Sequence, residues 1–254
     1  MLGISGAQGS GKSTFSRLLA AILDAQYSYR VAVLSLDDLY LTRAQRAELS
    51  TRVHPLLITR GVPGTHDSGF GMQLIELLCD ADRLHPIMLP SFDKSRDERR
   101  PEGQWTSFQG PADIVLFEGW CVGAKPQPSE ALTHPVNVLE AEEDPHGEWR
   151  AYVNGRLATD YADLFSRLDR LIMLEVPDLS SSYRWRREQE AELLAARTEG
   201  SGGAVMDDPR LRRFMMHYER LTRFMLDEMP GRADRVLRLD QHHRFTQIGV
   251  RSAP

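Results

Sequence analysis

Short apolar runs alternate along the chain with longer segments in which apolar residues recur every three or four positions. The runs predict buried strands at residues 1–5, 30–36, 113–117, 171–176 and 236–239, and a further short apolar run covers residues 86–90. The longer segments predict helices at residues 14–26, 42–49, 145–167, 180–197 and 209–229, with a further helix that ends at Leu78. Strands that alternate with helices indicate an α/β fold, with a mainly parallel sheet and helices on both faces.

Two details support the expected helices. Thr42 is a suitable N-cap residue, and Pro209 suits the first turn of the last helix. The first helix carries its apolar residues at helical spacing, which predicts one buried face: Phe15, Leu18, Leu19, Ile22 and Leu23.

Composition narrows the class of protein. The chain has 254 residues, 41% of them hydrophobic, which suits one globular domain over residues 1–254. The formal net charge of −5 argues against a nucleic-acid binder, and no apolar run is long enough to span a membrane. We see no signal peptide, and Cys79 and Cys121 are expected to be free thiols in a reducing cytoplasm. The sequence does not indicate an oligomeric state.

The segment G-A-Q-G-S-G-K-S at residues 6–13 fits the phosphate-loop pattern G-x-x-x-x-G-K-[ST]. Such a loop turns backbone N–H groups toward phosphate, and the helix that follows adds its positive dipole end. Lys12 can reach the β- and γ-phosphates of ATP, and Ser13 can bind Mg²⁺. The residues expected to hold the nucleotide are Gly6, Gly9, Ser10, Gly11, Lys12, Ser13 and Thr14.

Two further acids follow expected strands. Glu118 ends the strand at residues 113–117, and beside a phosphate loop it is a candidate for Mg²⁺ binding, directly or through water. Asp37 follows the second strand, where a carboxylate can take the proton of an acceptor hydroxyl. The sequence lacks the N-K-x-D motif typical of guanine-specific proteins, and it also lacks the L-S-G-G-Q motif of transporter ATPases. An ATP-dependent kinase is therefore favoured, and a non-catalytic ATP-binding regulator remains the alternative from another class.

Six segments together resemble one known family. They are the phosphate loop, S-L-D-D-L-Y at 35–40, R-G-V-P-G-T-H-D at 60–67, P-S-F-D-K-S at 90–95, F-E-G-W at 117–120 and Y-R-W-R at 183–186. In this order they resemble plant-type D-glycerate 3-kinases and their fungal and bacterial relatives, within the P-loop kinases related to uridine kinase, phosphoribulokinase and pantothenate kinase. The chain departs from the plant pattern at residues 96–100, R-D-E-R-R, where those kinases are rich in glycine and arginine.

The resemblance implies roles for particular residues. Asp37 is implied as the catalytic base, and Tyr40 as a residue that lines the acceptor site. Asp67 matches an acid that holds acceptor hydroxyls, and Asp93 and Lys94 match acceptor-pocket positions. His66 lies in the same glycine-rich loop, so we weigh it as a substrate residue against a buried structural histidine.

The family also implies an arginine-bearing lid helix, which falls at about residues 180–200. Arg184 and Arg187 are three positions apart and share a helix face, so we expect them to be the catalytic pair, whereas Arg186 points elsewhere. The implied acceptor is D-glycerate, a small hydroxy acid, whose carboxylate needs a cation such as Arg60, Lys94 or Arg96. A nucleoside or pantothenate remains the alternative acceptor.

Overall fold

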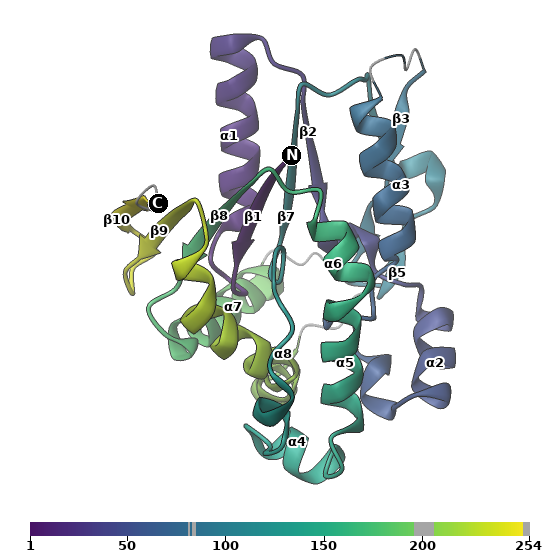
Figure 1. The fold of residues 1–254 in the computed structure, drawn as a ribbon, viewed down its shortest axis with the longest axis vertical. Coiled ribbons are helices and arrows are strands. Elements are labelled where there is room, and N and C mark those ends of the chain that lie inside the picture. Colours follow the sequence, from purple (N-terminus) through teal and green to yellow (C-terminus); the bar gives the residue numbers. More distant parts are fainter. Residues whose placement is uncertain (81, 83–84, 196–205, 251–254) are drawn as a thin grey trace.

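The computed structural model describes residues 1–80, 82, 85–195 and 206–250. Its centre is a six-stranded sheet in the order β10-β9-β8-β1-β7-β2 (Figure 1). All neighbouring strands are parallel except β10, which pairs antiparallel with β9. The strands span Leu2–Gly6 (β1), Val31–Ser35 (β2), Ile114–Gly119 (β7), Arg170–Glu175 (β8), Arg235–Leu239 (β9) and Phe245–Val250 (β10). The expected α/β fold with a mainly parallel sheet is confirmed.

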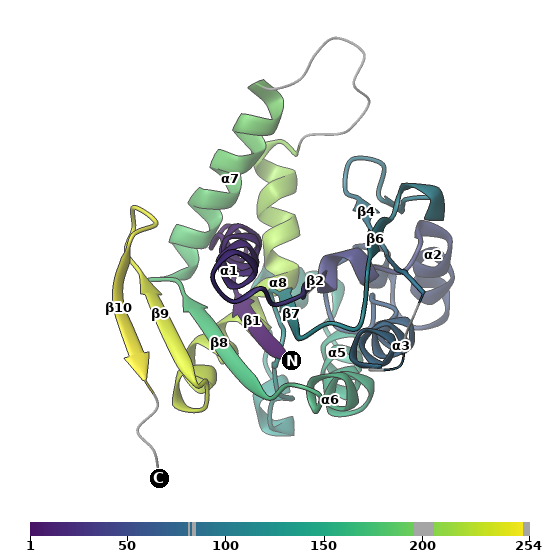
Figure 2. The ribbon, with the colours of Figure 1, turned by 90° about the horizontal axis from the view of Figure 1, so that it is seen from above.

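Helices cover both faces of the sheet (Figures 1 and 2). In β2, Ala32 and Leu34 face the larger core, whereas Val31 and Val33 face the smaller one, because successive side chains of a strand point to opposite faces. The larger core is completed by residues of α3 (Ser68–Cys79), α6 (Asp160–Phe165) and α8 (Asp208–Glu228). The smaller core is completed by α1 (Lys12–Tyr27) and by Trp185 of α7 (Leu179–Ala195).

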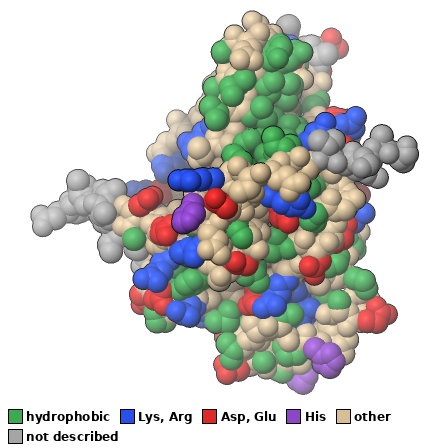
Figure 3. Space-filling view, turned by 90° about the vertical axis from the view of Figure 1, so that its left-hand side faces the viewer, with side chains coloured by type: hydrophobic (Ala, Val, Ile, Leu, Met, Phe, Trp, Pro, Cys, Tyr) green, Lys and Arg blue, Asp and Glu red, His purple; other side chains and the backbone are tan. Residues whose placement is uncertain are grey.

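The expected apolar face of α1 is only partly buried. Phe15 and Leu19 pack against the smaller core, but Leu18 is 60% exposed and Ile22 is 41% exposed. Figure 3 views the side of the molecule that carries α1 and β10, and hydrophobic side chains gather there. The prediction of one buried face was therefore wrong for these two residues, because the sheet contacts a narrower stripe of α1 than helical spacing alone implies.

The remaining elements are short helices and two small strand pairs outside the central sheet. α2 (Arg43–Arg52) has Thr42 as its N-cap, and the Thr42 side chain forms a capping box with Gln45. Two short antiparallel pairs follow, β3 (Ile87–Leu89) with β6 (Thr106–Phe108) and β4 (Phe92–Asp93) with β5 (Glu98–Arg99). The helix expected at residues 145–167 is two helices, α5 (Glu148–Ala158) and α6, and α4 (Val138–Glu143) precedes them. In the described ranges, no helix has the length and apolar character needed to cross a membrane.

α7 and α8 form an antiparallel pair that projects away from the sheet (Figure 2). The last helix begins with Asp207 as N-cap, two residues before Pro209. The lid was expected over residues 180–200, and its last part, 196–200, lies outside the described residues. Its described part is α7, whose amino-terminal turn contacts the phosphate loop as set out below.

Candidate active site

The phosphate loop joins β1 to α1 as expected. Gly9 and Gly11 adopt positive φ angles of 79° and 83°, and Lys12 is the first residue of α1. The loop is packed against α7: a Cβ at Gly9 would lie 2.8 Å from the Cβ of Trp185. In addition, the Ser182 hydroxyl donates to the Gln8 carbonyl at 2.6 Å. The helix dipole and the loop amides therefore face an anion site whose far wall is the start of α7.

Ser13 and Glu118 meet beside this loop. β7 lies between β1 and β2, so its terminal Glu118 is brought next to the start of α1. The Ser13 hydroxyl donates to Glu118 Oε1 at 2.8 Å. Glu118 Oε2 is buried and has no hydrogen-bond partner among the described residues. A buried carboxylate oxygen without a partner is costly, and an oxygen-ligated cation such as Mg²⁺ would satisfy it. The donor set therefore fits the metal expected from the sequence.

Asp37 lies in a short 3₁₀ turn, Leu36–Leu39, directly after β2. Its carboxylate accepts from Lys94 Nζ at 2.6 Å and from the Tyr40 hydroxyl at 2.7 Å. Burial alone would raise the pKa of Asp37, but the charges of Lys94 and Lys12 and these two hydrogen bonds hold that pKa well below its ordinary value. Asp37 is thus ionised at neutral pH and faces the phosphate-loop lysine.

The neighbouring Asp38 has a different environment. Its Oδ1 accepts the backbone N–H of Phe92 at 2.8 Å, which fixes the segment that carries Lys94 against the turn after β2. Burial raises the pKa of Asp38 to about 6 despite that hydrogen bond. The two adjacent acids therefore differ in role: Asp37 faces the site, and Asp38 positions the loop.

Arg60 is held rigidly beside Asp37 and Tyr40. Its guanidinium forms an ion pair with Asp97 and donates to the Lys94 carbonyl at 3.3 Å. The backbone is fixed at Gly61, which has a φ of 130°, and a Cβ there would lie 1.8 Å from the Tyr218 hydroxyl. Only glycine fits this position, because the Tyr218 hydroxyl donates to the Arg60 carbonyl at 3.0 Å.

Three of the expected substrate residues have structural contacts. His66 is buried, stacks on Tyr40 and lies 2.5 Å from the Tyr161 hydroxyl. Burial lowers the pKa of His66 to about 3, so the ring is neutral at pH 7. Asp67 caps α3 through the Phe70 N–H at 3.0 Å, and Asp93 accepts from Ser95 in the turn after β4. These residues shape the wall behind Tyr40 and Lys94.

A small cavity of about 40 Å³ gathers the remaining side chains. It is lined by Gln8, Lys12, Asp37, Tyr40, Arg60, Lys94, Trp120, Arg186, Phe214 and Tyr218. Within this described lining there are four cationic side chains and one carboxylate, Asp37, which pairs with Lys94. Arg60 and Arg186 pair with Asp97 and Glu190 outside the lining. This volume holds water but is smaller than a metabolite.

The arginines of α7 are arranged differently from the expectation. Arg186 lines the cavity, and its guanidinium pairs with the buried Glu190 one turn further along the helix. Arg184 instead donates toward the Gln241 carbonyl at 3.4 Å, and Arg187 is exposed and 3.9 Å from Asp208. Helical spacing paired Arg184 with Arg187, but it could not show that Arg186 is the arginine that lines the cavity with Lys12.

Other residues of the site carried weak sequence signals. Trp120 follows Glu118, and it donates from Nε1 to the Gly61 carbonyl at 2.8 Å. Tyr218 and Phe214 lie in a helix more than 150 residues from Asp37, so only the fold brings them to the site. His243 in the turn between β9 and β10 stacks on Trp185 and lies 2.7 Å from the Gly9 carbonyl.

Comparison with known proteins shows relatives over most of the chain, although no protein-family model matches it. The chain is 35% identical over 228 residues to a Schizosaccharomyces pombe protein named uncharacterized kinase mug58, covering 86% of this chain and 78% of that protein. It is 30% identical over 225 residues to the chloroplastic D-glycerate 3-kinase of Arabidopsis thaliana, covering 86% of this chain but only 46% of the plant protein.

A solved structure resembles the whole fold. The D-glycerate 3-kinase of Cryptococcus neoformans is 27% identical, with a TM-score of 0.78, and the match covers 98% of this chain and 88% of the fungal one. The six sequence segments, the geometry of the phosphate loop and these relatives agree. The chain therefore belongs to the family of P-loop kinases formed by plant-type D-glycerate 3-kinase and its fungal relatives.

Proposed function

We propose that this protein is an ATP-dependent kinase that transfers the γ-phosphate to a hydroxyl of D-glycerate, giving a phosphoglycerate. The observation that carries this proposal is the Asp37 carboxylate, which faces Lys12 of the phosphate loop in one cavity with Lys94 and Arg60. A nucleotide-binding protein needs the phosphate loop, but it has no need of an ionised acid at the acceptor side of the γ-phosphate. The choice of D-glycerate as the acceptor rests on the names of the plant and fungal relatives, which are both D-glycerate 3-kinases.

The residues divide the chemistry between them. The amides of residues 6–13 and Lys12 bind the phosphates, and Ser13 and Glu118 are the groups that would hold Mg²⁺. When bound, Mg²⁺ would neutralise charge on the β- and γ-phosphates. Asp37 accepts a hydrogen bond from the attacking hydroxyl and takes its proton as the hydroxyl oxygen bonds to the γ-phosphorus. The bond between the γ-phosphorus and the bridging oxygen breaks in the same step, and ADP leaves with that oxygen. Arg186 faces the same point and can stabilise negative charge on the moving group.

A carboxylate acceptor suits the cations around Asp37. Lys94 is paired with Asp37 across 2.6 Å, and its side chain is 52% exposed, so it is free to turn toward an incoming anion. If the carboxylate of glycerate takes Lys94, Asp37 loses the nearest cation that lowers its pKa. The base then becomes stronger at the moment when the acceptor hydroxyl arrives. A nucleoside lacks the anion that would draw Lys94 away.

We further propose that residues 1–254 form a single kinase domain in which the α7–α8 pair is the lid. The start of α7 contacts the phosphate loop through Ser182 and Trp185, so movement of the pair would alter the nucleotide site directly. Arg186 would then follow α7 toward the phosphates.

The test is ADP release with a panel of acceptors: D-glycerate, uridine and pantothenate, each with ATP and Mg²⁺. We expect D-glycerate to raise ADP production far above background and to yield a phosphoglycerate. A clear preference for uridine or pantothenate would refute the assignment of D-glycerate as the acceptor. If ATP binds but none of the acceptors changes its slow hydrolysis, the protein is an ATP-binding regulator instead.

A further inference from the structure

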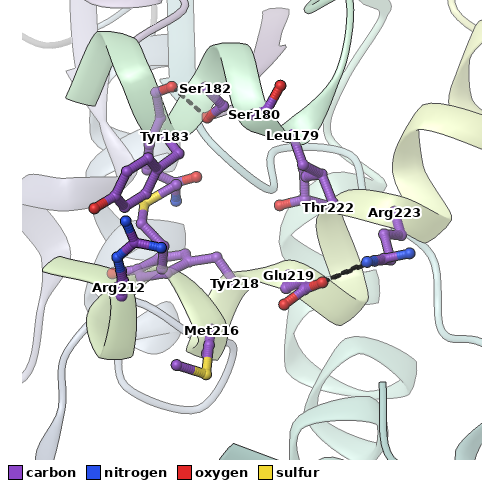
Figure 4. A pocket seen from close by; sticks show the side chains of 12 residues that line it. Leu179, Ser180, Ser182, Tyr183, Arg212, Met216, Tyr218, Glu219, Thr222 and Arg223 are labelled. Carbon is purple, nitrogen blue, oxygen red and sulfur yellow. Dashed lines mark hydrogen bonds and ion pairs between the residues drawn. The ribbon is translucent and has the colours of Figure 1, made fainter. Parts of the chain in front are cut away.

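A second cavity lies between α7 and α8, behind the phosphate loop (Figure 4). Its volume of about 340 Å³ falls within the range of small-molecule sites. It is lined by Gln8, Leu179, Ser180, Ser182, Tyr183, Arg212, Met215, Met216, Tyr218, Glu219, Thr222 and Arg223. Among the lining residues, only Gln8 and Tyr218 are shared with the active-site cavity, so the two cavities are adjacent at these residues.

The charged side chains of this second cavity are paired at its rim. Arg212 donates to Asp208 at 2.9 Å and lies over the Tyr183 ring, and Arg223 pairs with Glu219. Figure 4 shows these groups on opposite sides of the cavity. The interior is built from apolar and aromatic groups, including Leu179, Met215 and Met216. An ion that entered this cavity would lose its hydration shell and would meet only charges that are already paired. The cavity therefore disfavours charged ligands.

Two polar atoms at the cavity lack partners. Thr222 is 4% exposed, and its Oγ1 makes no hydrogen bond to any part of the chain that the structure describes. Gln8 Oε1 is also buried without a hydrogen bond to the described residues. A helix threonine usually satisfies its hydroxyl by bonding to a carbonyl one turn earlier, so the Thr222 hydroxyl remains open to a partner from outside the chain.

We propose that this cavity is an effector site for a small uncharged molecule with a flat apolar body and both a hydrogen-bond donor and an acceptor. An aromatic amide has this chemistry: its N–H can donate to Gln8 Oε1, and its carbonyl can accept from the Thr222 hydroxyl. Gln8 belongs to the phosphate loop, and its carbonyl accepts from Ser182 of α7 at 2.6 Å. Occupancy of the cavity therefore acts on the loop and on the start of α7, and it changes the affinity for ATP.

Benzamide is the probe, and benzoate, which has the same shape and a negative charge, is its matched control. Methyl signals of the methionines report the position of binding by NMR, because Met215 and Met216 line the cavity while Met88 lies in β3. We expect benzamide to shift the methyl signals of Met215 and Met216 but not that of Met88, and to bind with a dissociation constant on the order of 1 mM. Benzoate should bind at least about tenfold more weakly. Equal binding of the two, or no shift at about 20 mM benzamide, would overturn the site.

Thr222→Val tests the orphaned hydroxyl. Valine has nearly the same shape as threonine, so this substitution removes an unsatisfied buried hydroxyl and should raise Tm by about 2–4 °C. It should also weaken the binding of benzamide at least about threefold. Thr51→Val in α2 is the control, because the Thr51 hydroxyl already donates to the Ala47 carbonyl at 3.1 Å on an exposed surface. Unchanged benzamide affinity in Thr222→Val would refute the role of the hydroxyl and the proposed ligand chemistry.

The coupling is measured separately, as ATP affinity with and without saturating benzamide. We expect a change of at least about threefold, and by reciprocity ATP should change the affinity for benzamide by the same factor. Met215→Trp, which fills the cavity with a larger side chain, should abolish both effects. Binding of benzamide with no change in ATP affinity would refute the effector role, whatever the kinase activity proves to be.

Discussion

Replacing Arg186 with alanine should remove most of the turnover while the protein stays folded. Arg186 is the arginine of α7 that lines the cavity with Lys12 and Asp37. Preorganised charges aimed at a developing negative charge contribute about 100- to 1000-fold in rate, which corresponds to about 2.7–4.1 kcal/mol of transition-state stabilisation. We expect Arg186→Ala to lower kcat by that factor, with a smaller effect on ATP affinity, because the phosphates keep the loop amides and Lys12.

The cost in stability follows from the partner of Arg186. The ion pair is largely buried, with side-chain exposures of 18% for Arg186 and 8% for Glu190. After the substitution, Glu190 still accepts the Met206 N–H at 3.2 Å, so its carboxylate is not left bare. The expected loss is about 1–3 kcal/mol, typical of a lost hydrogen bond to a charged group, which lowers Tm without unfolding the protein at 25 °C.

The assay is steady-state ADP release with D-glycerate, together with a thermal melt of each variant. Arg187→Ala is the matched control, because this exposed arginine lies 3.9 Å from Asp208, and surface pairs of that kind are worth about 0–1 kcal/mol. A kcat loss in Arg187→Ala as large as that in Arg186→Ala would refute the reasoning. So would a normal kcat in Arg186→Ala.

Three further predictions test the acceptor side. Asp37→Asn should cut kcat by about 100-fold or more with ATP affinity retained, because the amide cannot take the hydroxyl proton; wild-type turnover would exclude Asp37 as the base. Lys94→Met should raise KM for D-glycerate by about 10- to 100-fold and leave KM for ATP nearly unchanged, as expected for loss of one charge-assisted hydrogen bond; equal increases in both constants would contradict the assignment. Because burial raises the pKa of Asp38 to about 6, the native state binds its proton more tightly than the unfolded chain does, so this residue contributes stability below pH 4 that is lost as pH rises to 6. Denaturant unfolding at several pH values should show that loss in the wild type but not in Asp38→Asn, and parallel pH curves for the two proteins would argue against it.

The sequence by itself determined the class of protein and the nucleotide side of the site. The phosphate-binding site can be identified from the sequence motif alone, because its chemistry comes from backbone amides and consecutive residues that need no distant partner. Residues at the ends of strands can be placed from the sequence almost as directly. Asp37 and Glu118 follow apolar runs, and parallel strands bring their carboxyl ends to one edge, so both acids were expected beside the phosphate loop. Asp37 lines a cavity with Lys12, and Glu118 accepts a hydrogen bond from Ser13. The capping box at Thr42 is local in the same sense.

The tertiary structure decided what depends on orientation and on distant contacts. Helical spacing showed that Arg184 and Arg187 share a face, but the packing of Trp185 against the phosphate loop is what turns Arg186 toward Lys12. The motif of residues 60–67 did not show that His66 is buried against Tyr161, or that Gly61 must make room for Tyr218 of α8. The cavity between α7 and α8 likewise joins Gln8 to Thr222, residues more than 200 positions apart. Such contacts follow from how helices dock on the sheet, and local patterns of hydrophobicity carry no information about that rotation.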